Sequence, residues 1–413
     1  MKLSQFSEFL TTYFIKYTTI TSQSKSNILE LPTTPGQILL AKMLKDDLTD
    51  FGITDIELQD NAILLAKISG TTAAPPILFM AHIDTVDIGE SPHVHAHIVN
   101  FKGEDFPLNK DKTIIFSVTD HPEIMNYQND NIIVTDGTSV LGGDDKAGVT
   151  VMMGLAKYLS SNNIPHGDVY LVFVPDEEVG LRGAYAFDIN KLPKNILSYT
   201  IDGGPIGEFG YETFNGASVV IDIKGVSIHP GSAKGILVNP ILVANNIISL
   251  LDPLDTPEHS EGKEGFILVT DISGNASDAK IEMIIRDFDK EKFNTRKIFL
   301  QQTISKIQQK YPKASIELEI SDSYANIANN LTNDKTCITI VEEAMSNLEI
   351  PIHVCPIRGG TDGAVFSSKG LPTPNLFTGA HNIHSIYEYL PISSFTKSLE
   401  VAIEIVKLAP NYK

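Results

Sequence analysis

His82 and Asp84 follow the apolar run "ILFMA" at residues 77–81, with one residue between them. Side chains two residues apart share a face of a strand, so the imidazole and the carboxylate are expected to point the same way. These groups can ligate a metal or move protons. A motif this short also fits a strand end whose polar residues meet solvent, so other parts of the chain have to decide.

Further acidic and imidazole side chains follow other apolar runs or Gly-rich turns. They are Asp144 and Asp145 in "LGGDDKAG", Asp176, Glu177 and Glu178 in "FVPDEEVG", Asp202 in "YTIDGG", and His381 and His384 in "GAHNIHSIYEYL". One such cluster alone suits a helix cap or a solvated turn. Because ligands of α/β proteins gather at the carboxyl ends of the strands, we expect the clusters to meet there.

The types of these residues narrow the chemistry. Histidine with several carboxylates and no cysteine favours a hydrolytic zinc, manganese or cobalt site over a structural zinc site. Two divalent cations would balance the carboxylates of Asp144, Glu178 and Asp202 together with one hydroxide, with His82 and His384 as neutral ligands. A two-metal hydrolase also needs one bridging carboxylate and one free carboxylate that moves protons.

Strands and helices that alternate along the chain must position these residues. Thr34, Pro35 and Gln37 mark a helix start that continues to about residue 48. Strands are predicted at 62–68, 76–82, 168–175, 198–202 and 373–379, and further helices at 147–161, 336–348 and 394–409. This order predicts a mainly parallel sheet covered by helices.

Residues 216–321 follow a different order. Strands are predicted at 217–225, 265–273, 279–288 and 315–321, and helices at 239–252 and 291–311. This βαββαβ order is typical of a ferredoxin-like unit. The predicted fold is therefore α/β, with a catalytic domain at 1–213 and 325–413 and an inserted α+β lid domain at 214–324.

Composition limits the class of protein. The 413 residues are 42% hydrophobic, and 51 acidic against 32 basic residues give a formal net charge of −19, which disfavours nucleic acid as a partner. Cys337 and Cys355 cannot build a disulfide framework. No apolar run reaches the length of a membrane span and no signal peptide stands at the start, so we expect a cytoplasmic protein without a membrane partner.

The motifs "HIDT", "VLGGDDKAG", "PDEEVG", "DGG", "HPGSAKG", "IIRDFD", "RGGTDGA" and "PNLFTG...H" occur in this order along the chain. Together they resemble the peptidase T family, tripeptide aminopeptidases among the glutamate-carboxypeptidase-like two-zinc metallopeptidases. The resemblance covers essentially the whole chain, and the combination is specific although each motif alone is not. One departure is "HSIYEY", with Ser385, Tyr387 and Tyr389, where the family has an "HGKHEF"-like stretch. This departure changes the wall of the substrate pocket and so puts in doubt which peptide side chains are preferred.

The resemblance implies two Zn²⁺ per chain, which Co²⁺ or Mn²⁺ could replace. The implied ligands are His82 and Asp202 for one ion, Glu178 and His384 for the other, and Asp144 as the bridge. Glu177 would be the general base, and Asp84 would orient the His82 ring. The family also implies a cis bond between Asp144 and Asp145.

In the inserted domain, the resemblance implies that His229 stabilises the oxyanion and that Arg286 binds the C-terminal carboxylate of the peptide. The implied substrate loop consists of Arg358, Gly359, Gly360, Thr361 and Asp362. A surplus carboxylate such as Asp176, or the acidic residues of the metal site, could receive the free α-amine of the peptide. A homodimer through the lid domain is a further expectation, whereas His93, His95 and His97 in "HVHAH" are interpreted as surface histidines.

We therefore predict a zinc metallopeptidase of peptide catabolism. It would release the N-terminal residue of tripeptides by attack of a metal-bridging hydroxide, with a Glu as general base. A related two-zinc dipeptidase, carboxypeptidase or N-deacylase is the alternative, and a catalytically silent metal-binding scaffold is a further one. A nucleotide-binding α/β protein is excluded because no P-loop or G-x-G-x-x-G follows the first strand.

Overall fold

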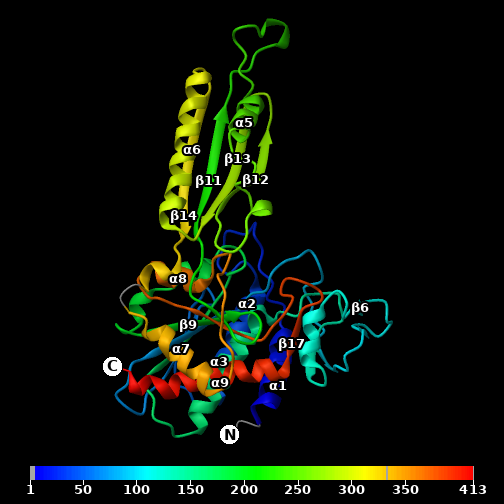
Figure 1. The fold of residues 1–413 in the computed structure, drawn as a ribbon, viewed down its shortest axis with the longest axis vertical. Coiled ribbons are helices and arrows are strands. Elements are labelled where there is room, and N and C mark those ends of the chain that lie inside the picture. The colour runs from blue at the N-terminus through cyan, green and yellow to red at the C-terminus, as the bar shows by residue number, and fades with distance from the viewer. Residues whose placement is uncertain (1–4, 332–333, 413) are drawn as a thin grey trace. The chain divides into compact units, whose positions relative to one another are not determined.

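The computed structural model describes residues 5–331 and 334–412; the parts of the predicted catalytic domain at 1–4, 332–333 and 413 lie outside them. The chain divides into two compact units, each drawn in Figure 1. Unit 1 comprises Met1–Tyr211, Asn330–Cys355 and Thr361–Lys413. Unit 2 comprises Glu212–Asn329 and Pro356–Gly360.

Unit 1 is built on an eight-stranded sheet of order β1-β2-β8-β3-β9-β16-β10-β15. Its strands are β1 (Asp55–Leu58), β2 (Leu64–Ile68), β3 (Ile77–His82), β8 (Val169–Val174), β9 (Leu197–Gly203), β10 (Glu208–Gly210), β15 (His353–Val354) and β16 (Asn375–Phe377). The central neighbours β8, β3, β9 and β16 run parallel, whereas β1 and β2 are antiparallel additions. The predicted α/β class with a mainly parallel sheet is confirmed.

Burial explains why the central strands are apolar runs. All six residues of β3 are buried, because strands in the middle of a parallel sheet are covered on both faces. The helices of unit 1 are α1 (Phe6–Thr18), α2 (Pro35–Asp50), α3 (Gly143–Ser161), α4 (Arg182–Ala186), α7 (Thr336–Asn347), α8 (Asp362–Ser368) and α9 (Ile392–Leu408). Helix α3 packs against β3 and β9 and contacts α1 and α9. The strand ends that follow these buried runs are therefore fixed by the core.

Smaller sheets complete unit 1. Strands β17 (Tyr389–Pro391), β7 (Asn131–Val134) and β4 (His97–Asn100) form one antiparallel sheet, and β5 (Phe106–Pro107) pairs with β6 (Ile115–Phe116). Phe101, Phe116 and Tyr389 are in the hydrophobic cluster of this region. The cluster fixes the chain just after His384, at the start of β17.

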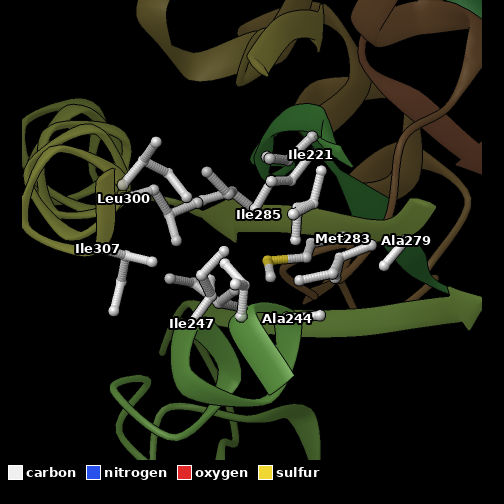
Figure 2. Packing of buried hydrophobic residues seen from close by; sticks show 14 of the residues in the cluster. Ile221, Ala244, Ile247, Ala279, Met283, Ile285, Leu300 and Ile307 are labelled. Carbon is white, nitrogen blue, oxygen red and sulfur yellow. The ribbon is translucent and has the colours of Figure 1, made fainter. Parts of the chain in front are cut away.

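Unit 2 is an antiparallel sheet of order β12-β13-β11-β14 with two helices. Its elements are β11 (Asn215–Lys224), α5 (Pro240–Ile248), β12 (Phe266–Gly274), β13 (Asp278–Asp287), α6 (Lys290–Lys310) and β14 (Ser315–Tyr324). Their order along the chain is the predicted βαββαβ order. Figure 2 shows Leu300 and Ile307 of α6 and Ala244 and Ile247 of α5 packed with Ile285 and Met283 of β13.

None of the helices described within 5–331 and 334–412 combines the length and the apolar character that crossing a membrane requires.

Candidate metal centre

His82 is the last residue of β3, and its ring is almost fully buried. Its Nε2 lies 2.8 Å from Asp144 Oδ1 and 3.6 Å from Asp202 Oδ1. Strand β9, which carries Asp202, is the parallel neighbour of β3, so the two strands deliver their polar ends to the same edge of the sheet. The predicted meeting of His82, Asp144 and Asp202 is thus observed.

Asp144 turns its second carboxylate oxygen toward another histidine. Its Oδ2 lies 3.1 Å from His384 Nε2, and that nitrogen lies 2.9 Å from Glu178 Oε1. The two oxygens of Asp144 therefore face two different imidazoles. This is the arrangement that a bridging carboxylate requires, with His82 and Asp202 on one side and His384 and Glu178 on the other.

The neighbouring Asp145 is occupied differently. Its oxygens accept main-chain N–H groups of His82 at 3.2 Å and of Gly148 at 3.1 Å. One of its oxygens still lies within 4.8 Å of ligand atoms of His82 and Asp202. The bond between Asp144 and Asp145 is cis, as the family resemblance implies. Of the two aspartates, Asp144 has the side-chain contacts that suit a bridge.

The donor set fits a pair of divalent cations. Ligand atoms of His82, Asp144 and Glu178 lie within 4.8 Å of one another, and those of His82, Asp145 and Asp202 form a second such group. Together with His384, whose Nε2 contacts Asp144 and Glu178, these residues provide two imidazoles, four carboxylates and no thiolate, which match the ligands of hydrolytic metal sites. The chemistry of the set agrees with two metal ions.

Asp84 links two parts of the centre. Its fully buried carboxylate accepts the main-chain N–H groups of Glu177 at 3.0 Å and of Glu178 at 3.2 Å. Its Oδ1 also lies 3.4 Å from His82 Nδ1, although the carbonyl oxygen of Asp84 is closer to that nitrogen, at 3.1 Å. Asp84 therefore holds the turn at 177–178 beside the His82 ring, and its main chain shares the contact with the imidazole.

Burial and mutual repulsion change the acidity of the carboxylates. Burial and the nearby charge of Asp144 raise the pKa of Asp202 to about 7. Burial raises the pKa of Glu177 well above its usual range, and Asp362 and Asp202 raise it further. Hydrogen bonds to Asp144 and Glu178 raise the pKa of His384 to about 10. A site that holds protons so strongly favours the binding of cations in their place.

Glu388 is an important residue that the sequence analysis missed. Its buried carboxylate accepts the main-chain N–H groups of Leu141 at 2.7 Å, Gly142 at 2.8 Å and Asp144 at 3.1 Å. Burial raises its pKa to about 7. Two signals were available: its place four residues after His384, and the glutamate that "HSIYEY" shares with the family's "HGKHEF"-like stretch. Its hydrogen-bond partners are about 245 positions earlier in the chain.

Asp176 is not free to receive a substrate amine. It is fully buried and accepts hydrogen bonds from the Thr33 main chain at 2.8 Å, the Thr33 hydroxyl at 2.5 Å and the Gln37 amide at 2.6 Å. The expectation for Asp176 is wrong because both of its oxygens serve the segment that precedes and begins α2. Gln37 takes part in this network, and the side chain of the N-cap residue Thr34 forms no capping hydrogen bond although α2 begins where predicted.

The remaining histidines of unit 1 lie outside the candidate metal groups. His381 is buried, accepts or donates a 2.8 Å hydrogen bond with the Tyr127 hydroxyl, and stacks on Tyr389. His93 contacts the Thr21 hydroxyl, and His97 lies in β4. Within the described residues, neither His93 nor His97 belongs to a group whose ligand atoms converge.

Two predicted substrate residues lie in unit 2. His229 is exposed, and its Nδ1 accepts the Gly231 N–H at 3.1 Å, so the neutral ring carries its proton on Nε2. Arg286 places its guanidinium 5.0 Å from the centre of the Tyr324 ring and donates to the Ile285 carbonyl at 3.1 Å. No carboxylate of the described residues forms an ion pair with Arg286, whereas Arg296 pairs with Asp255.

The predicted substrate loop is divided between the units. Arg358 donates to the Ser260 carbonyl and hydroxyl and to the Gly262 and Glu264 carbonyls, so its fork is engaged within unit 2. This argues against a substrate contact by Arg358. Gly359 has open space beside it, and Gly360 lies so close to Tyr324 that a Cβ would be 2.4 Å from the ring.

The other end of the loop, Thr361 and Asp362, begins the last segment of unit 1. The Thr361 hydroxyl and Asp362 Oδ1 are buried without a hydrogen-bond partner among the described residues. Burial raises the pKa of Asp362 well above its usual range, and the charges of Asp202 and Asp84 raise it further. These two residues are therefore the part of the loop that remains unpaired near the metal centre.

Comparison with known families places these residues in context. Residues 142–408 match the profile of peptidase family M20/M25/M40, and residues 64–202 match that of peptidase family M28. A peptidase T-like protein of Yersinia pestis is 47% identical over 96% of both chains. Peptidase T of Geobacillus kaustophilus is 42% identical over 96% of this chain and 97% of its own.

Solved structures share the fold. The aminopeptidase PepT of Bacillus cereus superimposes with a TM-score of 0.75 at 21% identity, covering 97% of this chain and 98% of its own. A dinuclear metal-binding peptidase of the M20 family from Bacillus subtilis gives a TM-score of 0.65 at 16% identity, covering 98% of this chain and all of its own. At these identities the likeness concerns the fold alone.

Proposed function

The chain belongs to the peptidase T group of peptidase family M20/M25/M40, and from this premise we propose that it is a two-zinc aminopeptidase that releases the N-terminal residue of tripeptides. One observation carries the proposal. The two oxygens of Asp144 face His82 and His384, with Asp202 and Glu178 beside these rings. We further propose that the enzyme acts in the cytoplasm.

His82, Asp144, Asp202, Glu178 and His384 would hold the two metal ions. When bound, the ions supply an activated water and polarise the carbonyl of the scissile peptide bond. Zinc is proposed because borderline nitrogen and oxygen ligands suit it, and Co²⁺ or Mn²⁺ could replace it. Asp84 would keep the His82 ring and the turn at 177–178 in a fixed relation during the reaction.

Glu177 would accept the proton of the attacking water and pass it to the leaving amine. Its main-chain N–H is held by Asp84, as is that of Glu178, but only Glu178 contacts His384. A general base works best when its pKa lies near the working pH. Burial of Glu177 moves its pKa upward from the ordinary range of a carboxyl, which supports this role.

Two residues of unit 2 would act on the substrate. His229 has its Nδ1 occupied as an acceptor, which leaves Nε2–H to donate to the developing oxyanion. Arg286 is a cation without a carboxylate partner among the described residues, and its fork suits the C-terminal carboxylate of a peptide. Thr361 and Asp362 are proposed to complete the substrate site, together with the open Gly359 and with Gly360.

A surplus of buried carboxylates would select for a free α-amine. Asp145, Glu177 and Asp362 add three carboxyl groups beyond the three acidic metal ligands; burial raises their pKa values, and the positive charge of bound metal ions would favour their ionised forms. Such a field attracts a cationic group and disfavours a blocked N-terminus. This distinguishes an aminopeptidase from an N-deacylase, which must accept an acylated amine.

A panel of peptides tests the proposal. Metal-reconstituted protein would be given di-, tri- and tetrapeptides with free termini, together with N-acetylated and C-amidated tripeptides, and release of free amino acid would be measured. We expect tripeptides with free termini to be the best substrates and the N-terminal residue to appear first. Preference for dipeptides, release from the C-terminus, or cleavage of acylated amines would assign the protein to the corresponding alternative activity. No hydrolysis by the fully metal-loaded protein would favour a silent scaffold.

A further inference from the structure

Glu388 lies between two segments that carry metal ligands. Its Oε2 accepts the N–H groups of Leu141 and Gly142, and its Oε1 accepts that of Asp144. The side chain is almost fully buried, so these three donors replace the water that a carboxylate normally binds. Hydrogen bonds that involve a charged acceptor are about twice as strong as neutral ones.

The turn at 141–144 cannot satisfy these donors itself. It contains the start of helix α3, whose N-cap residue Gly142 has no side chain that could accept a main-chain N–H. The first N–H groups of any helix need an acceptor from elsewhere. A Cβ at Gly143 would lie 2.8 Å from Glu388 Oε1 and 3.1 Å from Ala380 Cβ, so the two segments are in close contact at this point.

The loop that supplies Glu388 also supplies His384. Its main chain is fixed by a hydrogen bond from the Glu388 N–H to the Ser385 carbonyl at 3.1 Å. His381 and Tyr389 exchange main-chain hydrogen bonds across the loop, and Tyr389 continues into β17. His384 itself has a positive φ of 62°, a conformation that persists when the surroundings enforce it.

We propose that Glu388 is a positioning residue that sets the separation of His384 from Asp144, and thereby controls binding of the metal held by His384 and Glu178. The inference rests on the two-metal centre of the proposed function. The other ion has a different support, since His82 and Asp202 come from the paired strands β3 and β9, and the Asp84 carbonyl oxygen lies 3.1 Å from His82 Nδ1. Glu388 should therefore affect one site of the pair much more than the other.

The test is the variant Glu388→Gln. An amide can accept at only one of its two ends, so it must turn an NH₂ group toward main-chain donors and the clamp weakens. Metal-free protein would be titrated with Zn²⁺ in competition with a chromophoric chelator, which measures both affinities without any peptide. We expect one of the two sites to lose about 10- to 100-fold in affinity, the effect usual for a hydrogen-bond partner behind the ligands, with the other site unchanged.

A second variant, His384→Ala, shows which of the two metal sites Glu388 affects. In His384→Ala the site of His384 is already impaired, so adding Glu388→Gln should leave the remaining affinity as it is. Asp47→Asn is the matched control, because Asp47 is also a buried carboxylate of unit 1, bonded to Lys16 and Tyr17. It should keep both wild-type affinities.

Equal losses at both sites, or no loss at either, would overturn the positioning role. If Glu388→Gln does not fold, Gly143→Ala tests the same contact, because its methyl group presses on Glu388 Oε1 without changing the charge. The same selective loss is expected there, and unchanged affinities would contradict the proposal. A wild-type protein that binds two ions but cleaves no peptide would overturn the proposed reaction and leave this inference standing.

Discussion

Replacing Glu177 and Glu178 by Gln, one at a time, separates the roles proposed for two adjacent carboxylates. The structure makes them a matched pair. Both main-chain N–H groups are held by the Asp84 carboxylate, at 3.0 Å and 3.2 Å. Only the Glu178 side chain reaches an imidazole, with Oε1 2.9 Å from His384 Nε2. The substitutions keep the shape of each side chain and remove its charge.

The two variants should fail in different ways. Loss of a general base lowers turnover by about 100- to 10,000-fold, which is about 3 to 5 kcal/mol of activation free energy, so Glu177→Gln should show this loss with both metals bound. Loss of one charged ligand contact costs about 1.5 to 3 kcal/mol, so Glu178→Gln should bind the metal shared with His384 about 10- to 150-fold more weakly. High metal concentration should then restore part of the activity of Glu178→Gln and none of that of Glu177→Gln.

The assay combines metal content with kcat for a tripeptide. Each variant would be measured after dialysis against a metal buffer and again in excess metal. Equal metal content in the two variants with equal residual turnover would refute the division of roles. Recovery of Glu177→Gln by excess metal would show that Glu177 is a ligand.

Three further predictions concern the metals, the distal anchor and a buried histidine. Chelation should abolish hydrolysis and Zn²⁺, Co²⁺ or Mn²⁺ should restore it; full activity in protein shown by elemental analysis to be metal-free would contradict the mechanism. Arg286→Ala should lower kcat/KM by about 10- to 150-fold, which corresponds to the loss of one charge-assisted hydrogen bond, and amidation of a tripeptide's C-terminus should lower it by a similar factor. The two changes together should lower kcat/KM little more than either alone. Additive losses would show that Arg286 and the C-terminal carboxylate act separately. Burial lowers the pKa of His381 from 6.5 to about 4, so the unfolded chain binds more protons in this window and stability is lost as the pH falls through it. Between pH 7.5 and 5 the wild type should lose about 2 kcal/mol more unfolding free energy than His381→Gln in urea titrations followed by circular dichroism, and equal losses would contradict the shift.

Much of the fold could be predicted because its elements have strong local patterns. The buried run of β3 and the βαββαβ order of unit 2 are visible in the apolar periodicity. Helix α1 (Phe6–Thr18) was not predicted, because "FSEFLTTYFIKYT" is rich in aromatic and β-branched residues with modest helix propensity. Burial of Phe6, Leu10 and Phe14 stabilises it, and that contribution comes from tertiary packing.

The residues proposed as metal ligands could be picked out because each follows a recognisable strand or turn. What could not be predicted is which carboxylates serve the main chain. Asp176 and Glu178 are two residues apart in one motif. The Asp176 carboxylate accepts hydrogen bonds from Thr33 and Gln37, whereas the Glu178 carboxylate contacts His384. The role of Glu388 was equally hard to predict, because the main-chain groups that it binds, at 141–144, lie far away in the chain. Such assignments depend on long-range hydrogen bonds that periodicity does not record.

The balance of charge predicted from the sequence is incomplete in a way that bears on folding. Three acidic ligands and a hydroxide would neutralise two divalent cations, but the structure also buries the carboxylates of Asp84, Asp145, Asp362 and Glu388 in the same region. Lys146, buried nearby, has a pKa lowered by burial to about 7 and cannot compensate for all of them. Without metal, these carboxyl groups must either be protonated or repel one another as buried negative charges. Burial and the charge of Asp144 accordingly raise the pKa of Asp202 to about 7. Binding of the cations removes this repulsion, so metal binding near neutral pH should release protons and stabilise unit 1 as well as activate it.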